Sequence, residues 1–147
     1  MAKLSRTLHA MKQPGQYQIA VQGLAVIELG VSDSFKIHFW VSREGGLTIT
    51  IAGGFECTVR GQHYTVPEER DPVALGPTLA LLGHKAEALT AGEDGTLRLA
   101  LSEGAQVTVA PADGYESWHL NGPSGLLVVC LPGGGLAVWD AKPDTGP

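Results

Sequence analysis

The residues best suited to chemistry lie in one stretch, Tyr-Glu-Ser-Trp-His at 115–119. In an extended strand, Glu116 and Trp118 point to the same face. A carboxylate held against an indole loses solvent, which raises its pKa and suits it to general acid or base catalysis. Alternatively, Glu116 accepts backbone hydrogen bonds from the glycine turn at 132–135. We favour this structural role, because Glu56 recurs at a matching place in the first half of the chain.

The histidines and cysteines show no pattern of a metal site or of an activated nucleophile. No two histidines have the spacing of metal ligands on a helix, and Cys57 and Cys130 stand in apolar strand contexts that favour buried free thiols. The glycine run at 132–135 precedes an apolar strand, whereas phosphate cradles usually precede a helix. We therefore predict no catalytic residue, no metal and no cofactor.

Aromatic and histidine side chains are better candidates for binding. His38 and Trp40 alternate along the less apolar face of one expected strand, where they would line a pocket or a partner surface, or only a half-exposed sheet face. The others lie near the C-terminus. The predicted binding residues are Tyr115, Glu116, Trp118, His119, Trp139, His38 and Trp40.

The composition limits the function classes. The 147 residues predict one domain of 1–147, 44 % apolar and 17 % charged, and 20 glycines point to many tight turns. A net charge of −5 argues against a general nucleic-acid binder and suits a basic protein partner. No apolar h-region follows the basic N-terminal residues and no run reaches 18 apolar residues, so we expect a cytoplasmic protein.

The pattern along the chain is that of an all-β protein with a minor helix. Residues 3–12 favour one short amphipathic helix or a frayed terminus. Residues 67–83 form an acidic loop followed by a short helix near 77–82. We expect a first β unit at 15–66, a second at 84–140 and a tail at 141–147. The expected strands cover 17–21, 24–31, 35–41, 47–52, 55–59, 63–66, 85–91, 96–101, 106–110, 115–120, 126–131 and 136–139.

The last three of these strands form a predicted β-meander around which we expect the fold to be organised. Its middle strand, 126–131, is a run of six apolar residues between turn signals, which predicts burial of both faces.

The second half of the chain repeats the first at an offset of 60. Gly23 matches Gly83, and Leu29 matches Leu89; the offset slips by two at one turn and returns where Phe55-Glu56 matches Tyr115-Glu116. We interpret this as a duplication of a three-stranded antiparallel unit. Each unit has an apolar face that it cannot bury alone, so the pair predicts a sandwich or a partly open barrel.

Three segments, YESW, GTLRLALSEGAQVTV and LVVCLPGGGLAVW, resemble the C-terminal half of an uncharacterised family of small actinobacterial β-rich proteins. In that family an aromatic-Glu-x-Trp precedes a Pro-Gly-Gly turn and a final Trp. The resemblance covers residues 15–140 and implies no particular activity. The first half departs from the motif, because Phe55-Glu56-Cys57-Thr58 lacks the tryptophan.

Two functions fit these features, and a third possibility is a subunit of a larger assembly joined through edge strands. The first is a non-enzymatic protein-binding module, similar in type to immunity proteins that neutralise toxins. The second is a small-molecule binder or cofactor-free enzyme with a pocket between the two β units, walled by Glu116, Trp118, His119 and Trp139. We favour the first, because no catalytic constellation is visible. The sequence does not predict the oligomeric state.

Overall fold

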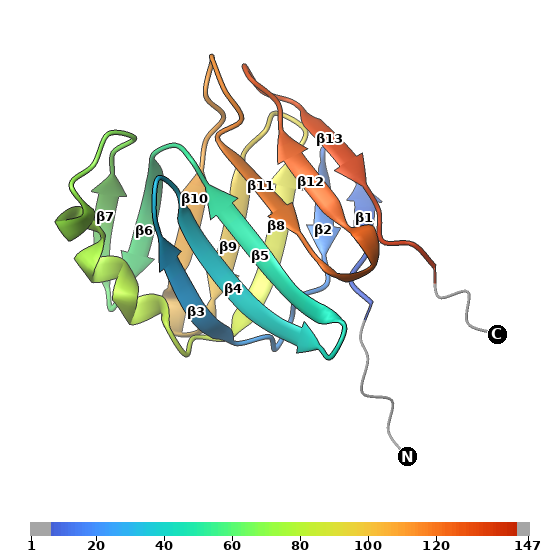
Figure 1. Ribbon diagram of the computed structural model, residues 1–147, viewed down its shortest axis with the longest axis horizontal. Helices are drawn as coiled ribbons and strands as arrows, with labels where there is room; N and C mark the ends of the chain where they lie inside the picture. The colour runs from blue at the N-terminus through green and yellow to red at the C-terminus, as the bar shows by residue number, and fades with distance from the viewer. Residues whose placement is uncertain (1–6, 144–147) are drawn as a thin grey trace.

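The computed structural model describes residues 7–143, which form two antiparallel sheets stacked as an open sandwich (Figure 1). The seven-stranded sheet has the order β1-β2-β8-β9-β10-β6-β7. Its strands are β1 (Ala10–Gln13), β2 (Gln16–Ile19), β6 (Phe55–Val59), β7 (Gln62–Val66), β8 (Ala86–Gly92), β9 (Leu97–Leu101) and β10 (Gln106–Val109).

The six-stranded sheet faces the viewer in Figure 1 and has the order β13-β12-β11-β5-β4-β3. The predicted all-β sandwich is therefore confirmed, and so is the C-terminal meander. Its strands are β3 (Val26–Val31), β4 (Phe35–Ser42), β5 (Gly45–Ile51), β11 (Trp118–Asn121), β12 (Leu127–Cys130) and β13 (Leu136–Trp139).

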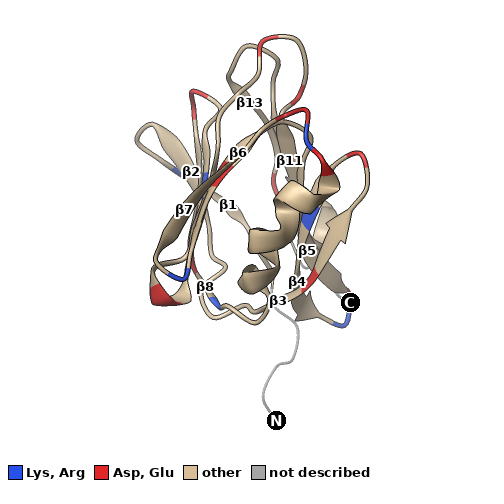
Figure 2. Ribbon diagram, turned by 90° about the vertical axis from the view of Figure 1, so that its left-hand side faces the viewer, with Lys and Arg blue, Asp and Glu red and all other residues tan. Residues whose placement is uncertain are grey.

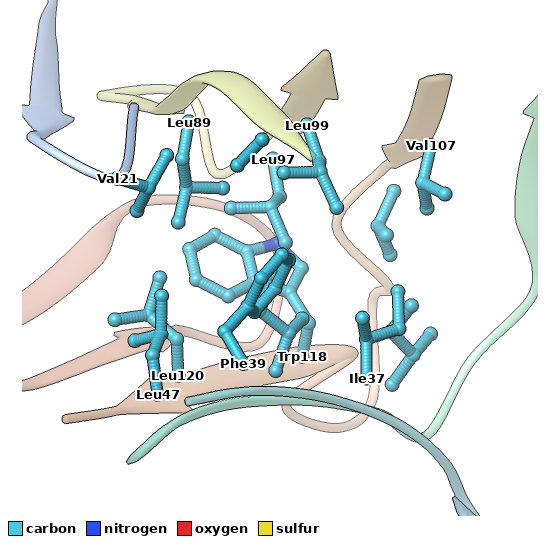
Figure 3. Close-up of a cluster of buried hydrophobic side chains, with 14 of the residues drawn as sticks. Val21, Ile37, Phe39, Leu47, Leu89, Leu97, Leu99, Val107, Trp118 and Leu120 are labelled. Atoms are coloured by element: carbon cyan, nitrogen blue, oxygen red, sulfur yellow. The ribbon is translucent and has the colours of Figure 1, made fainter. Parts of the chain in front are cut away.

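The two sheets enclose one hydrophobic core made of the inward-facing residues that alternate along their strands. Trp118 and Phe39 lie at its centre, between Leu120 and Leu47 of one sheet and Leu89 of the other (Figure 3). All five side chains are at most 1 % exposed, so side chains fill the space between the β units. The predicted burial of both faces of β12 is wrong: its side chains alternate between buried and half-buried, as expected when one face is turned outward.

The helical segment between the repeats is longer than predicted. A 3-10 helix, η1 (Pro72–Leu81), replaces the expected helix near 77–82. It begins earlier because the Asp71 side chain accepts the Val73 N–H at the N-cap and Pro72 occupies the first turn, where a missing N–H costs nothing. Two further 3-10 turns, η2 (Ser102–Gly104) and η3 (Pro123–Gly125), connect strands.

The N-terminal segment also differs from the prediction. Residues 10–13 form strand β1 rather than a helix, because their backbone pairs with β2 and the Asp140 carboxylate accepts the Ala10 N–H. Tertiary pairing here outweighs a short amphipathic pattern. Part of the predicted helix, and residues 144–147 of the predicted tail, lie outside the described residues.

The duplication appears as a pseudo-two-fold set of hydrogen bonds between the repeats. The Gly23 N–H donates to the Ala86 carbonyl, and the Gly83 N–H donates to the Val26 carbonyl. The Val26 N–H likewise bonds the His84 carbonyl, and the Ala86 N–H bonds the Leu24 carbonyl. Every donor and acceptor is thus exchanged under the offset of 60. Both strands that follow carry a bulge at the matching position, Val26/Glu28 in β3 and Ala86/Ala88 in β8.

Each repeat gives its fourth strand to the other repeat's sheet. The first repeat forms the meander β3-β4-β5, yet its next strand, β6, pairs with β10 of the second repeat. The second repeat forms β8-β9-β10, and its next strand, β11, pairs with β5 of the first. This exchange of strands holds the two sheets together, because neither repeat completes its own sheet.

The register of the exchanged strands corrects one predicted match. Ile49 pairs with Leu120, and its counterpart Val107 pairs with Cys57. Cys57 is thus equivalent to Leu120, and Phe55 two residues earlier is equivalent to Trp118. The predicted match of Phe55-Glu56 with Tyr115-Glu116 is wrong, because the loop before β11 (110–117) is five residues longer than the loop before β6 (52–54).

Candidate binding surfaces

Four of the seven predicted binding residues come together on the outer face of the six-stranded sheet. His38 and Trp40 point outward from β4, His119 from β11 and Trp139 from β13. We call this surface the six-stranded face. Its other members are Glu28, Gly30, Lys36, Thr48, Thr50, Asn121, Leu127, Val129 and Ala137.

The strand register arranges this face in rows that run across the sheet. One row joins Trp139, Leu127, Asn121, Thr48 and His38 as successive cross-strand neighbours. Within this row the His38 ring nitrogen Nδ1 lies 2.9 Å from Thr48 Oγ1. This hydrogen bond links two cross-strand neighbours and holds the His38 ring against β5.

A second row carries His119, which is half-buried, between Thr50 of β5 and Val129 of β12. The far end of the first row reaches Glu28, whose Oε1 lies 3.8 Å from His38 Nε2. The centre of the six-stranded face is therefore polar and nearly neutral, with hydroxyl, amide and imidazole groups that are able to donate or accept hydrogen bonds.

Two tryptophans flank this polar centre. The Trp40 and Trp139 side chains are each 55 % exposed, although an indole is costly to leave in water. Large amphipathic side chains of this kind carry most of the energy in protein–protein interfaces, where a few Trp, Tyr and Arg residues dominate. The two exposed indoles thus give this face a residue composition that is common in protein interfaces.

Trp118, by contrast, is a core residue, so the prediction that it takes part in binding is wrong. Its side chain is fully buried (Figure 3), and its indole Nε1–H donates to the Gly95 carbonyl at 2.8 Å. The strand alternation turns Trp118 inward and His119 outward, so the two neighbours belong to opposite sides of the sheet. Trp118, His119 and Trp139 therefore do not wall one cavity.

Tyr115 and Glu116 lie in the loop before β11 and not in the strand itself. Glu116 is exposed and does not pack on Trp118, so the proposed acid in an apolar wall is not formed. Tyr115 is half-buried in a depression of about 470 Å³ that Glu68 and Asp113 also line. Burial raises the pKa of Tyr115, and the hydrogen-bonded Glu68 carboxylate adds to the effect.

The depression lies at one end of the sandwich, which we call the acidic end. It consists of the loops at 14–15, 32–34, 52–54, 67–71, 93–96, 110–117 and 131–135, and Figure 2 shows acidic segments gathered there. Among these loops the only basic residue is Arg70, whose guanidinium bonds the Gly53 carbonyl at 3.1 Å. The acidic residues of this end are Asp33, Glu68, Glu69, Asp71, Glu93, Asp94, Asp113 and Glu116.

One polar cluster was missed by the sequence analysis. On the outer face of the β6–β7 hairpin, His63 Nε2 lies 2.6 Å from Glu56 Oε1 and His63 Nδ1 lies 3.1 Å from Thr58 Oγ1. Thr65 Oγ1 also donates to Glu56. The set looks like a hydrolytic triad, but His63 and Glu56 are exposed on an open sheet face. We read it as a cross-strand polar ladder, which the Arg60-Gly61 turn signal and strand alternation would have revealed.

A second depression, of about 650 Å³, lies at the end opposite the acidic end. Arg60, His84 and Glu103 line it together with Leu82 and Ser102. The His84 ring nitrogen Nδ1 lies 2.9 Å from the Ser102 carbonyl, so a proton on Nδ1 satisfies that contact. Because Arg60 and Glu103 carry opposite charges, the lining of this depression does not favour one class of ligand.

Both cysteines are buried free thiols, and burial raises the pKa of Cys57 to about 11. Among residues 7–143, no group of three or more His, Cys, Asp or Glu side chains is placed to hold a metal ion. Nor does any helix in the described part of the chain combine the length and apolar character needed to cross a membrane.

Comparison with known proteins adds the family. A model for a family of unknown function, DUF6188, matches residues 18–140. The chain belongs to this DUF6188 family. The match begins within β2 and runs to the end of β13, so it covers both repeats and the exchanged strands but not β1. No curated protein sequence and no solved structure matches the chain.

Proposed function

We propose that this DUF6188 protein is a non-enzymatic protein-binding module that holds a basic protein partner on its six-stranded face. The observation that carries the proposal is the pair of half-exposed indoles, Trp40 and Trp139, on one face that His38 and His119 share. Aromatic anchors around hydrogen-bonding groups are the usual composition of a protein interface core.

The acidic end supports the choice of a basic partner. Eight carboxylates outnumber the two basic groups near them, Arg70 and Lys12, which pairs with Glu93, so this end has a negative potential that accelerates the approach of a positive protein. The depression beside Tyr115 has room for one lysine or arginine side chain, with Glu68 and Asp113 to pair with it. In this proposal the six-stranded face provides most of the binding energy, and the acidic end orients the basic partner as it approaches.

The finer part of the proposal is an inhibitor or immunity type of activity in the cytoplasm. A protein that neutralises a basic toxin needs a rigid scaffold, a hydrophobic anchor and a complementary charge, and it needs no chemistry of its own. A basic toxin recovered as the partner, and encoded beside this protein, would support this type. A partner with an ordinary housekeeping activity would support binding without the immunity role.

The test is affinity capture from an extract of the source cells with three tagged proteins. These are the native sequence, the double variant Trp40→Ala/Trp139→Ala and a control, Arg98→Ala/Gln106→Ala, altered on the outer face of the seven-stranded sheet. We expect the native protein and the control to retain the same basic protein, and the double variant to lose it. Equal retention by all three proteins, or no enriched protein with the native sequence, would refute the proposal.

A further inference from the structure

The pseudo-two-fold axis pairs two sheet edges that differ in one respect. In the second repeat, the outer edge of β8 is covered by β2. In the first repeat, the equivalent edge is that of β3, and among residues 7–143 β3 pairs with β4 alone. In the described part of the chain, β2 thus covers the edge of β8, but no strand covers the equivalent edge of β3.

The backbone register shows which groups this open edge presents. The Ser32 N–H bonds the Ser34 carbonyl, so the alternation of antiparallel pairs directs the backbone of Gly30 toward β4 and that of Leu29 and Val31 outward. In β8 the Glu93 N–H bonds the Gly15 carbonyl, which by the same alternation directs Leu89 and Ala91 toward β2. The outward-directed residues of β3 are thus the counterparts of those that β2 already satisfies.

Side-chain exposure shows the same difference. Leu89 and Ala91 are fully buried beneath the strands that cover them, with Ile19 of β2 as the partner of Leu89. Their counterparts are not covered: Leu29 is half-buried, and Val31 is 51 % exposed. An edge strand with free backbone groups and uncovered apolar side chains is a template for another strand.

We propose that the edge of β3 is the interface of a homodimer, in which β3 pairs antiparallel with β3 of a second copy of this chain. Leu29 of each copy lies opposite Val31 of the other, and Gly30 lies opposite Gly30 on the two-fold axis. The two six-stranded sheets become one continuous sheet, and the symmetric contact closes both edges. The proposal does not rest on the proposed function.

A second copy fits this edge because β3 is complementary to itself. In this pairing Leu29 and Val31, whose backbone groups point away from β4, lie opposite Val31 and Leu29 of the second copy. Each of these two residue pairs exchanges two backbone hydrogen bonds, which gives four in total. Apolar inward side chains lie opposite apolar ones, as Ile19 lies opposite Leu89 in the pair of β2 with β8. Glu28 lies opposite Ser32 of the second copy, so no like charges are directly opposed.

Neither the bulge nor η1 prevents this pairing. The bulge at Val26/Glu28 has an identical counterpart at Ala86/Ala88, and β8 still pairs with β2 over residues 89–92 beyond its bulge. The segment that follows η1 bonds β3 at Val26, through the Gly83 N–H and the His84 carbonyl, whereas η1 itself lies beside β3 at the open side of the sandwich (Figure 2). The other terminal strands are β1, β7 and β13: β1 and β7 carry Lys12, Gln62 and His63, and β13 is followed by Asp140, whose carboxylate accepts the Ala10 N–H of β1.

The first test is the mass in solution, measured by light scattering after size exclusion. We expect twice the chain mass of 15.4 kDa at micromolar concentrations. The variant Val31→Lys should give the monomer, because it places a charge in the apolar pair, whereas the control Leu131→Lys, made at an exposed leucine after β12, should stay dimeric. A monomer for the native chain, or a dimer that Val31→Lys leaves intact, would overturn the proposal.

The second test reads the register through a disulfide. Gly30 lies opposite Gly30 of the second copy in a non-hydrogen-bonded pair, in which Cβ atoms come close enough for a disulfide. A Cβ added at Gly30 meets no atom of its own chain nearer than 3.4 Å. Gly30→Cys should therefore crosslink on mild oxidation, since both native thiols are buried. Its counterpart Thr90→Cys, whose edge β2 covers, is the control and should stay uncrosslinked. A dimer without the Gly30→Cys crosslink, or equal crosslinking of both variants, would place the interface elsewhere.

Discussion

At the scale of single residues, burial separates Trp118 from the other two tryptophans. Trp118 is fully buried and hydrogen-bonded, so Trp118→Ala should lower the free energy of unfolding by about 3–5 kcal/mol. Trp139→Ala, which removes a half-exposed indole, should cost less than about 1 kcal/mol. Urea denaturation of both variants measures the difference. Equal losses would contradict the assignment of Trp118 to the core and Trp139 to a binding face.

Cys57 shows how burial controls reactivity and pH dependence. Its pKa is raised by burial from 9.0 to about 11, so its thiolate is scarce at pH 8 and a thiol reagent should label it only after unfolding. The unfolded chain releases the proton first, so this contribution to stability is complete below pH 9 and is lost as the pH rises toward 11. Thermal melts of the native chain and of Cys57→Ala between pH 8 and 11 test this sign. A stability of the native chain that rises in this range, relative to Cys57→Ala, would contradict it.

At the scale of elements, the duplicated junction depends on a matched pair of glycines. Gly23 and Gly83 have φ of +88° and +85°, a region in which other residues are strained. Gly23→Ala and Gly83→Ala should therefore each destabilise the protein by about 1–2 kcal/mol and by similar amounts. Gly114→Ala, at a site with open space and no such φ, is the control and should be nearly neutral. Clearly unequal costs at the two junction glycines would argue against their equivalence.

The strands themselves could be predicted because their physical signals are local. Alternation such as Leu47-Thr48-Ile49 and the glycine turns locate most strands within one or two residues. The strand β1 and the start of η1 could not, because pairing of Ala10 with Ile19 and the Asp71 cap depend on the folded environment. Residues 115–117 were predicted to begin the strand at 115–120 but belong to the loop before β11, because the alternation of Tyr115 and Glu116 with their neighbours mimics a strand.

At the scale of the whole molecule, the exchange of β6 and β11 decides which predicted site residues meet. The sequence reveals the repeat, but a repeat alone does not tell whether each unit keeps its own fourth strand. Because β11 joins the sheet of the first repeat, His119 comes to lie on the same face as His38 and Trp40. A chain folded as two separate units would have divided these residues between two surfaces.

The charge distribution gives a prediction on association kinetics. Glu69→Lys/Glu116→Lys, at the acidic end, should slow association with a basic partner at least about tenfold at low salt and change dissociation little. Glu87→Lys/Glu103→Lys changes the net charge equally at the other end and should have a much smaller effect. Surface plasmon resonance over a range of salt concentrations measures both rates. Equal effects of the two variants would show that net charge, and not the acidic end, controls the encounter.

The most direct measurement of the central claim is the dissociation constant between the captured partner and purified protein, determined by calorimetry. If the six-stranded face is the docking surface, Trp40→Ala/Trp139→Ala should weaken binding by at least about 30-fold, which corresponds to about 2 kcal/mol for the loss of interface anchors. The control Arg98→Ala/Gln106→Ala should bind like the native chain. An unchanged dissociation constant for the tryptophan variant, with its fold intact, would contradict the assignment of this face.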